Sequence, residues 1–320
     1  MTPPDRTDAI ARPPTPFDRG ADRAFRGLTF AASLLAVALV VGIVAQVART
    51  AEPAVREYGT DFLTTSKWDP SGKKFGILPQ IAGTIYSSVL GVALGSLFGI
   101  TVAIFLTQDF LPPRLETLIK RVVELLSAVP SVVYGLWGIF VVIPAVRPLA
   151  NAVHEVAGGV PFFGTRLAGP GLLPAAFVLA IMVLPTVTAI ARDALAAVPG
   201  KLREAAFGLG ATRWEVILKV VLPTASRGIF GAVVLAFGRA VGETMALAML
   251  FGNNNSFSWS LFAPGNTLAA LIANQWPESA AAEKGALMYA GLVLLGITLL
   301  INSFGTLILR RTVRAEEAHQ

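Results

Sequence analysis

The fold is decided by residues 199–223, which read PGKLREAAFGLGATRWEVILKVVLP. This polar stretch separates two strongly apolar segments in the second half of the chain. Gly208 and Gly210 are expected to end a short helix, because glycine accepts the left-handed geometry that a helix end needs. Thr212 and Glu215 have the spacing of a capping box, which predicts the start of a second helix.

Pro223 is expected to end this pattern, because proline removes a backbone donor and clashes with the preceding turn. The sequence therefore predicts an elbow at 199–223, formed by two short helices at an angle. The elbow carries Arg203, Arg213 and Lys219. On charge alone, an ordinary basic cytoplasmic loop would account for it as well as a docking element.

The spacing inside the elbow favours docking. It resembles the EAA loop of ABC-transporter permeases, whose pattern is Glu-Ala-Ala, three residues, Gly, nine residues, Ile, one residue and Leu-Pro. Only the Ile position departs from this pattern, to Val220. The resemblance implies that the elbow seats in a cleft of a separate ATP-hydrolysing subunit. The residues that would couple the two are Glu204, Ala205, Ala206, Gly210, Leu222 and Pro223.

The composition indicates a polytopic membrane protein. Of the 320 residues, 54% are hydrophobic and 14% are charged, whereas about a quarter are charged in soluble domains. The absence of cysteine excludes disulfides and thiolate chemistry. His154 and His319 are far apart in sequence, which predicts no metal cluster. The net charge of +6 could suggest nucleic acid, but a positive bias on the cytoplasmic side of a membrane explains it better.

Six apolar segments are long enough to cross a hydrocarbon core, which takes about 20 residues. They are 27–48, 80–107, 125–146, 172–191, 228–252 and 285–309. A signal peptide is the alternative for the first segment, but its apolar region would be shorter, about 7–15 residues. Around these spans we expect a disordered tail (1–26), an external loop (49–79), a permease core (80–309) that includes the elbow, and a short tail (310–320). Within the core we expect a Gly- and Pro-rich loop (147–169) and a polar loop (253–284).

Two of the spans carry glycines with a structural meaning. Gly91, Gly95 and Gly99 stand four apart on one helix face, and small residues at that spacing let helices pack closely in lipid. In the stretch 130–138, PSVVYGLWG, a proline and two glycines predict an interrupted helix. Such a helix either lines a pathway or is simply kinked.

The distribution of Lys and Arg predicts the orientation. About two-thirds of the 26 Lys and Arg residues fall on the side that holds the elbow and both ends of the chain. Both termini and the elbow are therefore expected to face the cytoplasm.

The fifth span contains Arg239 and Glu243 near its middle. Each charge costs about 2.5–3.5 kcal/mol at the centre of a spanning helix on insertion scales. Being four apart, the two are expected to share a face and to neutralise each other in part. A structural ion pair is one interpretation, and a substrate route is the other.

Arginine suits a tetrahedral oxyanion, because its planar fork donates two hydrogen bonds and stays charged when desolvated. A neighbouring carboxylate repels an anion unless that anion carries a proton to donate. Phosphate carries one at neutral pH and sulfate does not. The pair Arg239 and Glu243 therefore predicts selectivity for phosphate.

Three stretches resemble the PstC-type family of phosphate-specific ABC permeases: GRAVGETMA at 238–246, FLTTSKWDP at 62–70 and PSVVYGLWG at 130–138. With the elbow, the resemblance covers roughly 25–310. It implies an all-α permease of the type I importer class with six spans in the bacterial plasma (inner) membrane. It also implies that Arg239 and Glu243 are required for transport, and Thr244 is placed on the same substrate pathway.

The resemblance further implies a set of partners. These are a PstA-type permease, two ATP-binding PstB-type subunits and an external phosphate-binding PstS-type protein. The chain has no Gly-x4-Gly-Lys-Ser/Thr loop, so we expect no cofactor in it and ATP bound by the partners. Two alternatives stay open: a permease for another oxyanion such as molybdate or sulfate, and a membrane enzyme that uses Glu243 as an acid or base.

Overall fold

The computed structural model describes residues 15–317, and their side chains up to residue 309. Most of this part is helical, and six helices are long and apolar enough to cross a membrane. The predicted all-α fold with six spans is confirmed. The spans are Pro16–Tyr58, Leu78–Thr107, Ser131–Ala157, Leu172–Ala196, Arg213–Val241 and Ala281–Leu309. The chain divides into two compact units, residues 1–50 and 51–320.

The first unit holds most of helix α1 (Pro16–Tyr58). The helix begins earlier than predicted, because Thr15 and Asp18 cap it reciprocally. The Thr15 N–H donates to Asp18 Oδ2 at 2.9 Å, and the Asp18 N–H donates to Thr15 Oγ1 at 3.2 Å. The prediction of a disordered tail is therefore wrong for residues 16–26, and residues 1–14 lie outside the described part of the chain.

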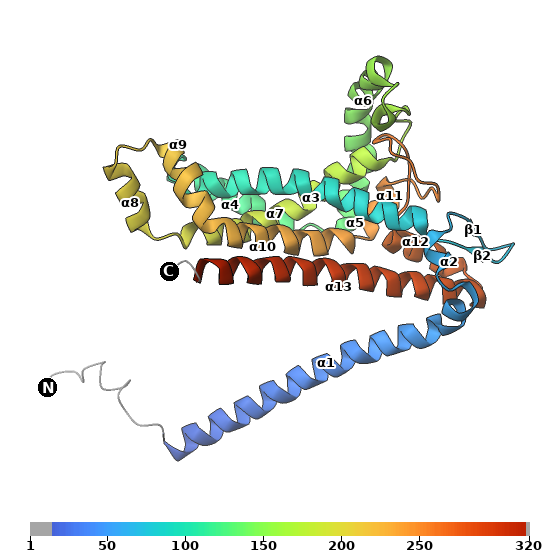
Figure 1. The fold of residues 1–320 in the computed structure, drawn as a ribbon, viewed down its shortest axis with the longest axis horizontal. Coiled ribbons are helices and arrows are strands. Elements are labelled where there is room, and N and C mark those ends of the chain that lie inside the picture. The colour runs from blue at the N-terminus through green and yellow to red at the C-terminus, as the bar shows by residue number, and fades with distance from the viewer. Residues whose placement is uncertain (1–14, 318–320) are drawn as a thin grey trace. The chain divides into compact units, whose positions relative to one another are not determined.

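The second unit is a bundle of helices with one small β-hairpin (Figure 1). Its elements beyond the end of α1 are α2 (Asp61–Thr64), β1 (Trp68–Asp69), β2 (Lys74–Phe75), α3 (Leu78–Thr107), α4 (Pro113–Ala128), α5 (Ser131–Trp137), the π-helix η1 (Gly138–Val142), α6 (Ile143–Ala157), the 3₁₀ turn η2 (Pro161–Phe163), α7 (Leu172–Ala196), α8 (Gly200–Gly208), α9 (Arg213–Val216), the π-helix η3 (Ile217–Val221), α10 (Leu222–Val241), α11 (Met245–Leu250), α12 (Leu268–Gln275), the 3₁₀ turn η4 (Trp276–Glu278) and α13 (Ala281–Glu317).

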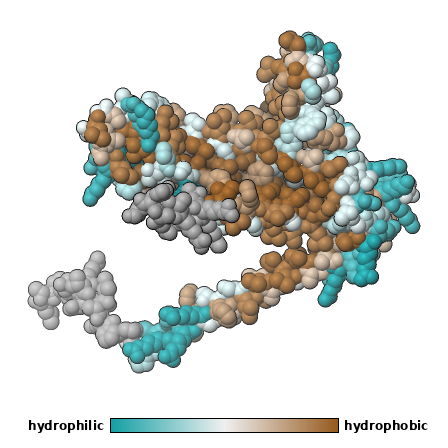
Figure 2. Space-filling view, in the orientation of Figure 1, coloured by the Kyte–Doolittle hydropathy of each residue, from teal (hydrophilic) through white to brown (hydrophobic). Residues whose placement is uncertain are grey.

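The elbow and the small hairpin lie at opposite ends of this bundle (Figure 1). Strands β1 and β2 pair antiparallel, with Trp68 opposite Phe75. Beside them the Phe62 ring stacks on Tyr289 of α13, with ring centroids 4.5 Å apart. Figure 2 shows hydrophobic residues over the middle of the bundle and hydrophilic residues at its two ends. This distribution fits a bundle that crosses a membrane with the elbow and the hairpin on opposite sides.

The centre of the bundle is the contact between α3 and α7. A Cβ atom on Gly91, Gly95 or Gly99 would lie within 3 Å of side-chain atoms of α7, from Leu179, Val183 and Val187 respectively. Such a distance leaves no room for a methyl group, so these glycines set the separation of the two helices. The predicted packing seam is confirmed.

The third span differs from the prediction of 125–146. Helix α4 ends at Ala128, and a new helix starts after Pro130, the predicted interruption. The span then continues to Ala157, through what was predicted as a loop beginning at residue 147. The wide turns of η1 come just before Pro144 and provide space for a ring that lacks an N–H donor.

The second predicted loop also contains more structure than expected. Residues 253–284 were predicted as a polar loop, yet they include α12, whose Thr267 cap accepts a hydrogen bond from the Ala270 N–H at 3.2 Å. Leu268 and Leu271 of α12 are fully buried. The segment is therefore part of the packed bundle.

We predict that Gly95→Ala destabilises the protein. The added Cβ would lie 2.5 Å from Val183 Cγ2 and 2.8 Å from the Ala180 carbonyl oxygen, so α3 and α7 must separate. Overpacking of this kind costs about 1–3 kcal/mol. The measurement is thermal unfolding of the purified protein in detergent. Gly296→Ala in α13 is the matched control, because its Cβ meets nothing within 4 Å. Equal melting temperatures for the two variants would contradict the seam.

Candidate functional site

The elbow has the local structure that its sequence predicts. Helix α8 ends at Gly208, and Gly210 has a φ of +84°, which favours glycine. Thr212 then caps α9 in a complete capping box with Glu215. The Thr212 N–H donates to Glu215 Oε2 at 3.0 Å, and the Glu215 N–H donates to Thr212 Oγ1 at 3.4 Å.

Pro223 does not end the second elbow helix, contrary to the prediction. Helices α9, η3 and α10 form one continuous span from Arg213 to Val241. The five residues before Leu222 form a π-helix, and Pro223 falls within the first two positions of α10. The wider turn accommodates the proline without a break. The second arm of the elbow is therefore rigidly joined to the span that carries Arg239.

The predicted coupling residues divide between the two arms. Glu204, Ala205 and Ala206 lie on α8, while Leu222 and Pro223 lie at the start of α10. Glu204 and Ala205 are exposed and Ala206 is half-buried. Large apolar side chains around them are also exposed: Leu202 at 44%, Phe207 at 48% and Leu209 at 90%. Apolar residues this exposed at the polar end of a bundle indicate a docking surface.

Two arginines attach the elbow to the bundle. Arg203 of α8 donates from Nη2 to the Leu195 carbonyl at 3.0 Å. Arg213 of α9 donates from Nη2 to the carbonyl of Gln108 and lies over the Phe110 ring, 4.1 Å from its centroid. A displacement of the elbow is thereby passed to α7 and to the connection between α3 and α4.

The fifth span is interrupted at its charged residues, which corrects the prediction of one helix over 228–252. Helix α10 ends at Val241, and α11 begins at Met245. Arg239 thus lies in the last turn of α10, whereas Glu243 and Thr244 lie in the break. The two charges do not share a helix face, and the described residues show no ion pair between them.

Residues in and next to the break form hydrogen bonds with some of its backbone N–H and C=O groups. The Glu243 N–H donates to the Ala240 carbonyl at 3.2 Å, and Glu243 Oε1 accepts from the Ala246 N–H at 3.3 Å. Thr244 Oγ1 donates to the Gly242 carbonyl at 3.1 Å. These bonds matter because lipid offers no partners for free N–H and C=O groups. One carboxylate oxygen of Glu243 caps α11, and the other has no hydrogen bond to the side chains and backbone that the structure describes up to residue 309.

Arg239 is exposed in this single chain. Within the described residues, its guanidinium makes no hydrogen bond or ion pair. In α5, the Tyr134 hydroxyl donates to the Leu126 carbonyl at 2.7 Å across the Pro130 interruption. A cation left unpaired at membrane depth is costly, so the Arg239 side chain is available to a ligand or a partner.

The interruptions of the third and fifth spans pack against each other. A Cβ on Gly135 of α5 would lie 2.6 Å from Met249 Sδ, and one on Gly138 would lie 2.6 Å from Leu250 Cδ1. The two glycines therefore allow α5 and η1 to approach α11 closely. The stretch 130–138, predicted as either a pathway lining or a kink, lies beside the break that holds Glu243.

The sequence reasoning missed an amide network beyond α11. Gln80 of α3 donates to Asn255 Oδ1 at 2.8 Å, and Asn266 Nδ2 donates to Asn253 Oδ1 at 2.8 Å and to Asn255 Oδ1 at 3.1 Å. Gln80 and Asn266 are buried. The sequence shows that the run Asn253–Asn255 is polar, but Gln80, the partner of Asn255, lies 175 positions away.

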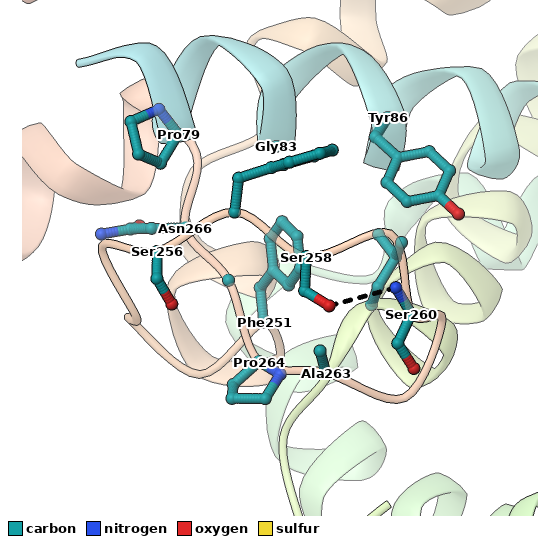
Figure 3. Close-up of a pocket in the computed structure, with 13 residues that line it drawn as sticks. Pro79, Gly83, Tyr86, Phe251, Ser256, Ser258, Ser260, Ala263, Pro264 and Asn266 are labelled. Carbon is teal, nitrogen blue, oxygen red and sulfur yellow. Dashed lines mark hydrogen bonds between the residues drawn. The ribbon is translucent and has the colours of Figure 1, made fainter. Parts of the chain in front are cut away.

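Next to this network lies a small pocket (Figure 3). It is lined by Gly83 and Tyr86 of α3 and by serines of the 251–266 segment, where the Ser260 N–H donates to Ser258 Oγ at 3.2 Å. Its volume of about 10 Å³ is barely enough for one water molecule. The pocket is therefore a packing defect of the segment, and no transported anion fits in it.

Comparison with known proteins places this arrangement in context. Residues 95–314 match the family model described as binding-protein-dependent transport system inner membrane component. The phosphate transport system permease protein PstC of Mesorhizobium japonicum is 40% identical over 91% of this chain and 89% of its own length. The PstC protein of Xylella fastidiosa is 36% identical over 93% of this chain and 94% of its own.

Solved structures share the fold. A chain of a bacterial alginate ABC transporter, crystallised in complex with an alginate pentasaccharide-bound periplasmic protein, aligns with a TM-score of 0.63 at 16% identity, covering 91% of this chain and 97% of its own. A chain of the MetNI methionine ABC transporter in an inward-facing conformation aligns with a TM-score of 0.54 at 19% identity, covering 73% and 95%.

We predict that Thr212→Ala loosens the second arm of the elbow. The substitution removes the hydroxyl that accepts from the Glu215 N–H. The loss of this N-cap raises the population of the state in which the first turn of α9 is unfolded, by about fivefold. Hydrogen exchange at residues 213–216 should speed up by that factor. Thr224→Ala is the control, because its hydroxyl bonds only to the Val220 carbonyl of the same helical run. Unchanged exchange in Thr212→Ala would show that the cap does not hold the elbow.

Proposed function

Because this chain belongs to the family of binding-protein-dependent transport inner membrane components, and within it to the PstC phosphate permeases, we infer that it is the permease subunit of an ATP-driven importer of inorganic phosphate. It is a multi-pass protein of the inner membrane. The observation that carries this conclusion is the 40% identity to a phosphate permease over 91% of the chain. The site geometry adds Arg239, which has no hydrogen bond or ion pair within the described part of the chain, beside an interrupted span.

We propose that Arg239 meets the phosphate in transit. Its guanidinium offers parallel N–H donors that fit two oxygens of a tetrahedral anion. Glu243 accepts a hydrogen bond from the protonated oxygen of hydrogen phosphate, through the carboxylate oxygen that does not cap α11. Thr244 lines the same break. Support for this assignment comes from the free donors of Arg239 and the interrupted helix at this level of the membrane.

The second half of the proposal concerns coupling. Partner subunits of the PstB type bind and hydrolyse ATP and receive the elbow at Glu204, Ala205, Ala206 and Gly210. Because α9, η3 and α10 are continuous, a movement of the elbow displaces the end of α10 where Arg239 lies. A PstA-type permease completes the pathway, and a PstS-type protein delivers phosphate from outside. This chain binds no cofactor, and its elbow and termini face the cytoplasm.

We predict that Arg239→Lys lowers phosphate uptake at least tenfold, because a single ammonium cannot replace the bidentate fork. Glu243→Gln should instead narrow the preference for phosphate over sulfate, because the amide no longer repels an anion without a proton. The measurement is uptake of labelled phosphate in vesicles that hold the complete transporter, in competition with sulfate and molybdate. Assembly is checked by copurification of the ATPase subunits.

Arg192→Lys is the control for Arg239→Lys, because Arg192 pairs with Asp193 near the end of α7, away from the break. Wild-type uptake in Arg239→Lys would contradict the proposed role of Arg239. Equal uptake of phosphate and sulfate by the wild-type transporter would contradict the role of Glu243.

We predict that Gly210→Ala uncouples ATP hydrolysis from uptake. An alanine at a φ of +84° is strained, which costs about 1 kcal/mol. Relief of this strain changes the angle between the two arms of the elbow. The ratio of phosphate imported to ATP hydrolysed should fall several-fold. Gly208→Ala is the control, since Gly208 ends the same helix and an added Cβ there would meet nothing within 4 Å. A normal ratio in both Gly210→Ala and Glu204→Ala would rule out coupling through the elbow.

A further inference from the structure

A cavity of about 260 Å³ lies at the base of the elbow. It is formed where α8 and α9 face the connection that follows α3. Arg203, Arg213 and Asp109 all line it. The volume accommodates a tetrahedral anion together with several water molecules, each of which occupies about 30 Å³ in the liquid.

Both arginines of the cavity are held in place and keep unused donors. Each is anchored by one Nη2 bond to a main-chain carbonyl, of Leu195 for Arg203 and of Gln108 for Arg213. A guanidinium has five N–H donors, so most of them remain. Arg203 Nε is buried and has no hydrogen-bond partner. A buried donor without a partner is expensive to maintain, and the remaining donors of both guanidinium groups are available to a ligand in the cavity.

The nearby acidic groups do not neutralise these arginines. Glu215 is engaged by Thr212 and by Lys219, whose Nζ lies 3.2 Å from Glu215 Oε1. Among the side chains that the structure describes, up to residue 309, no carboxylate lies within ion-pair distance of Arg203 or Arg213. Asp109 lines the cavity without forming an ion pair itself. The cavity therefore holds two cations and one anion, a net positive charge with one carboxylate acceptor.

We propose that this cavity is a second site for inorganic phosphate, separate from the pathway at Arg239. The two guanidinium groups donate to phosphate oxygens, and the carboxylate of Asp109 accepts a hydrogen bond from the protonated oxygen of hydrogen phosphate. A sulfate or a lipid phosphodiester has no such proton, so Asp109 disfavours both. The choice of phosphate among proton-bearing oxyanions rests on the proposed function. A bound anion would bridge both arms of the elbow to the connection at 108–110.

The test is equilibrium binding of labelled inorganic phosphate to the purified full-length chain that carries Arg239→Gln. This background removes the main binding group of the pathway, so any phosphate that still binds reports on the cavity at the base of the elbow. We expect saturable binding of phosphate, with sulfate at least about tenfold weaker, the effect of one charge-assisted hydrogen bond. Adding Arg213→Gln should reduce phosphate binding at least tenfold.

Because Arg213 also anchors the elbow, a second variant leaves the fold untouched. Asp109 has a φ of +51°, and asparagine tolerates this geometry well. Asp109→Asn should bring sulfate binding close to that of phosphate, which no purely structural effect would do. Glu116→Gln on α4, which does not line the cavity, is the control and should leave the preference unchanged.

Three outcomes would overturn the proposal: no saturable phosphate binding in the Arg239→Gln chain, an unchanged preference in Asp109→Asn, or displacement of phosphate by phosphatidylglycerol. The last would assign the cavity to a lipid headgroup. The proposed function fails on a different result, wild-type uptake in the Arg239→Lys transporter, so the two failures can be told apart.

Discussion

The structure depends on one constraint: inside a bilayer, every backbone N–H and C=O must find a partner within the protein. The interruption between α10 and α11 meets this constraint with its own residues. The main chain of Glu243 donates to Ala240, and its side chain accepts from Ala246. Gly135 and Gly138 then let the interrupted third span pack directly against α11. Non-helical backbone is thus placed at membrane depth, with Arg239 at its edge.

The same constraint connects the two ends of the molecule. At the elbow, the π-helix at Ile217–Val221 carries the chain past Pro223 without a break. The docking arm and the span of Arg239 are for this reason one rigid element from Arg213 to Val241. A hinge at Pro223 would have separated them. Force applied at the elbow can reach the break because the helix between them is continuous.

Much of this could be read from the sequence where the signals are local. The glycine at 210, the capping box at Thr212 and the glycine seam of α3 each act over a few residues, and all three are confirmed. The break at Glu243 was missed because an apolar run reads as one helix. Beyond the break, Met249 of α11 packs against Gly135 of α5, a contact between segments far apart in the sequence. The network of Gln80 with Asn255 was missed because it joins distant segments.

The central claim is that the break beside Arg239 lines the route of the phosphate. The chain contains no cysteine, so Thr244→Cys introduces a single thiol into it at the break. The most direct measurement is the rate at which a small water-soluble thiol reagent modifies this chain in the assembled transporter. The account predicts modification that phosphate slows and sulfate does not. A thiol that never reacts, or one that reacts equally fast with phosphate present, would contradict it.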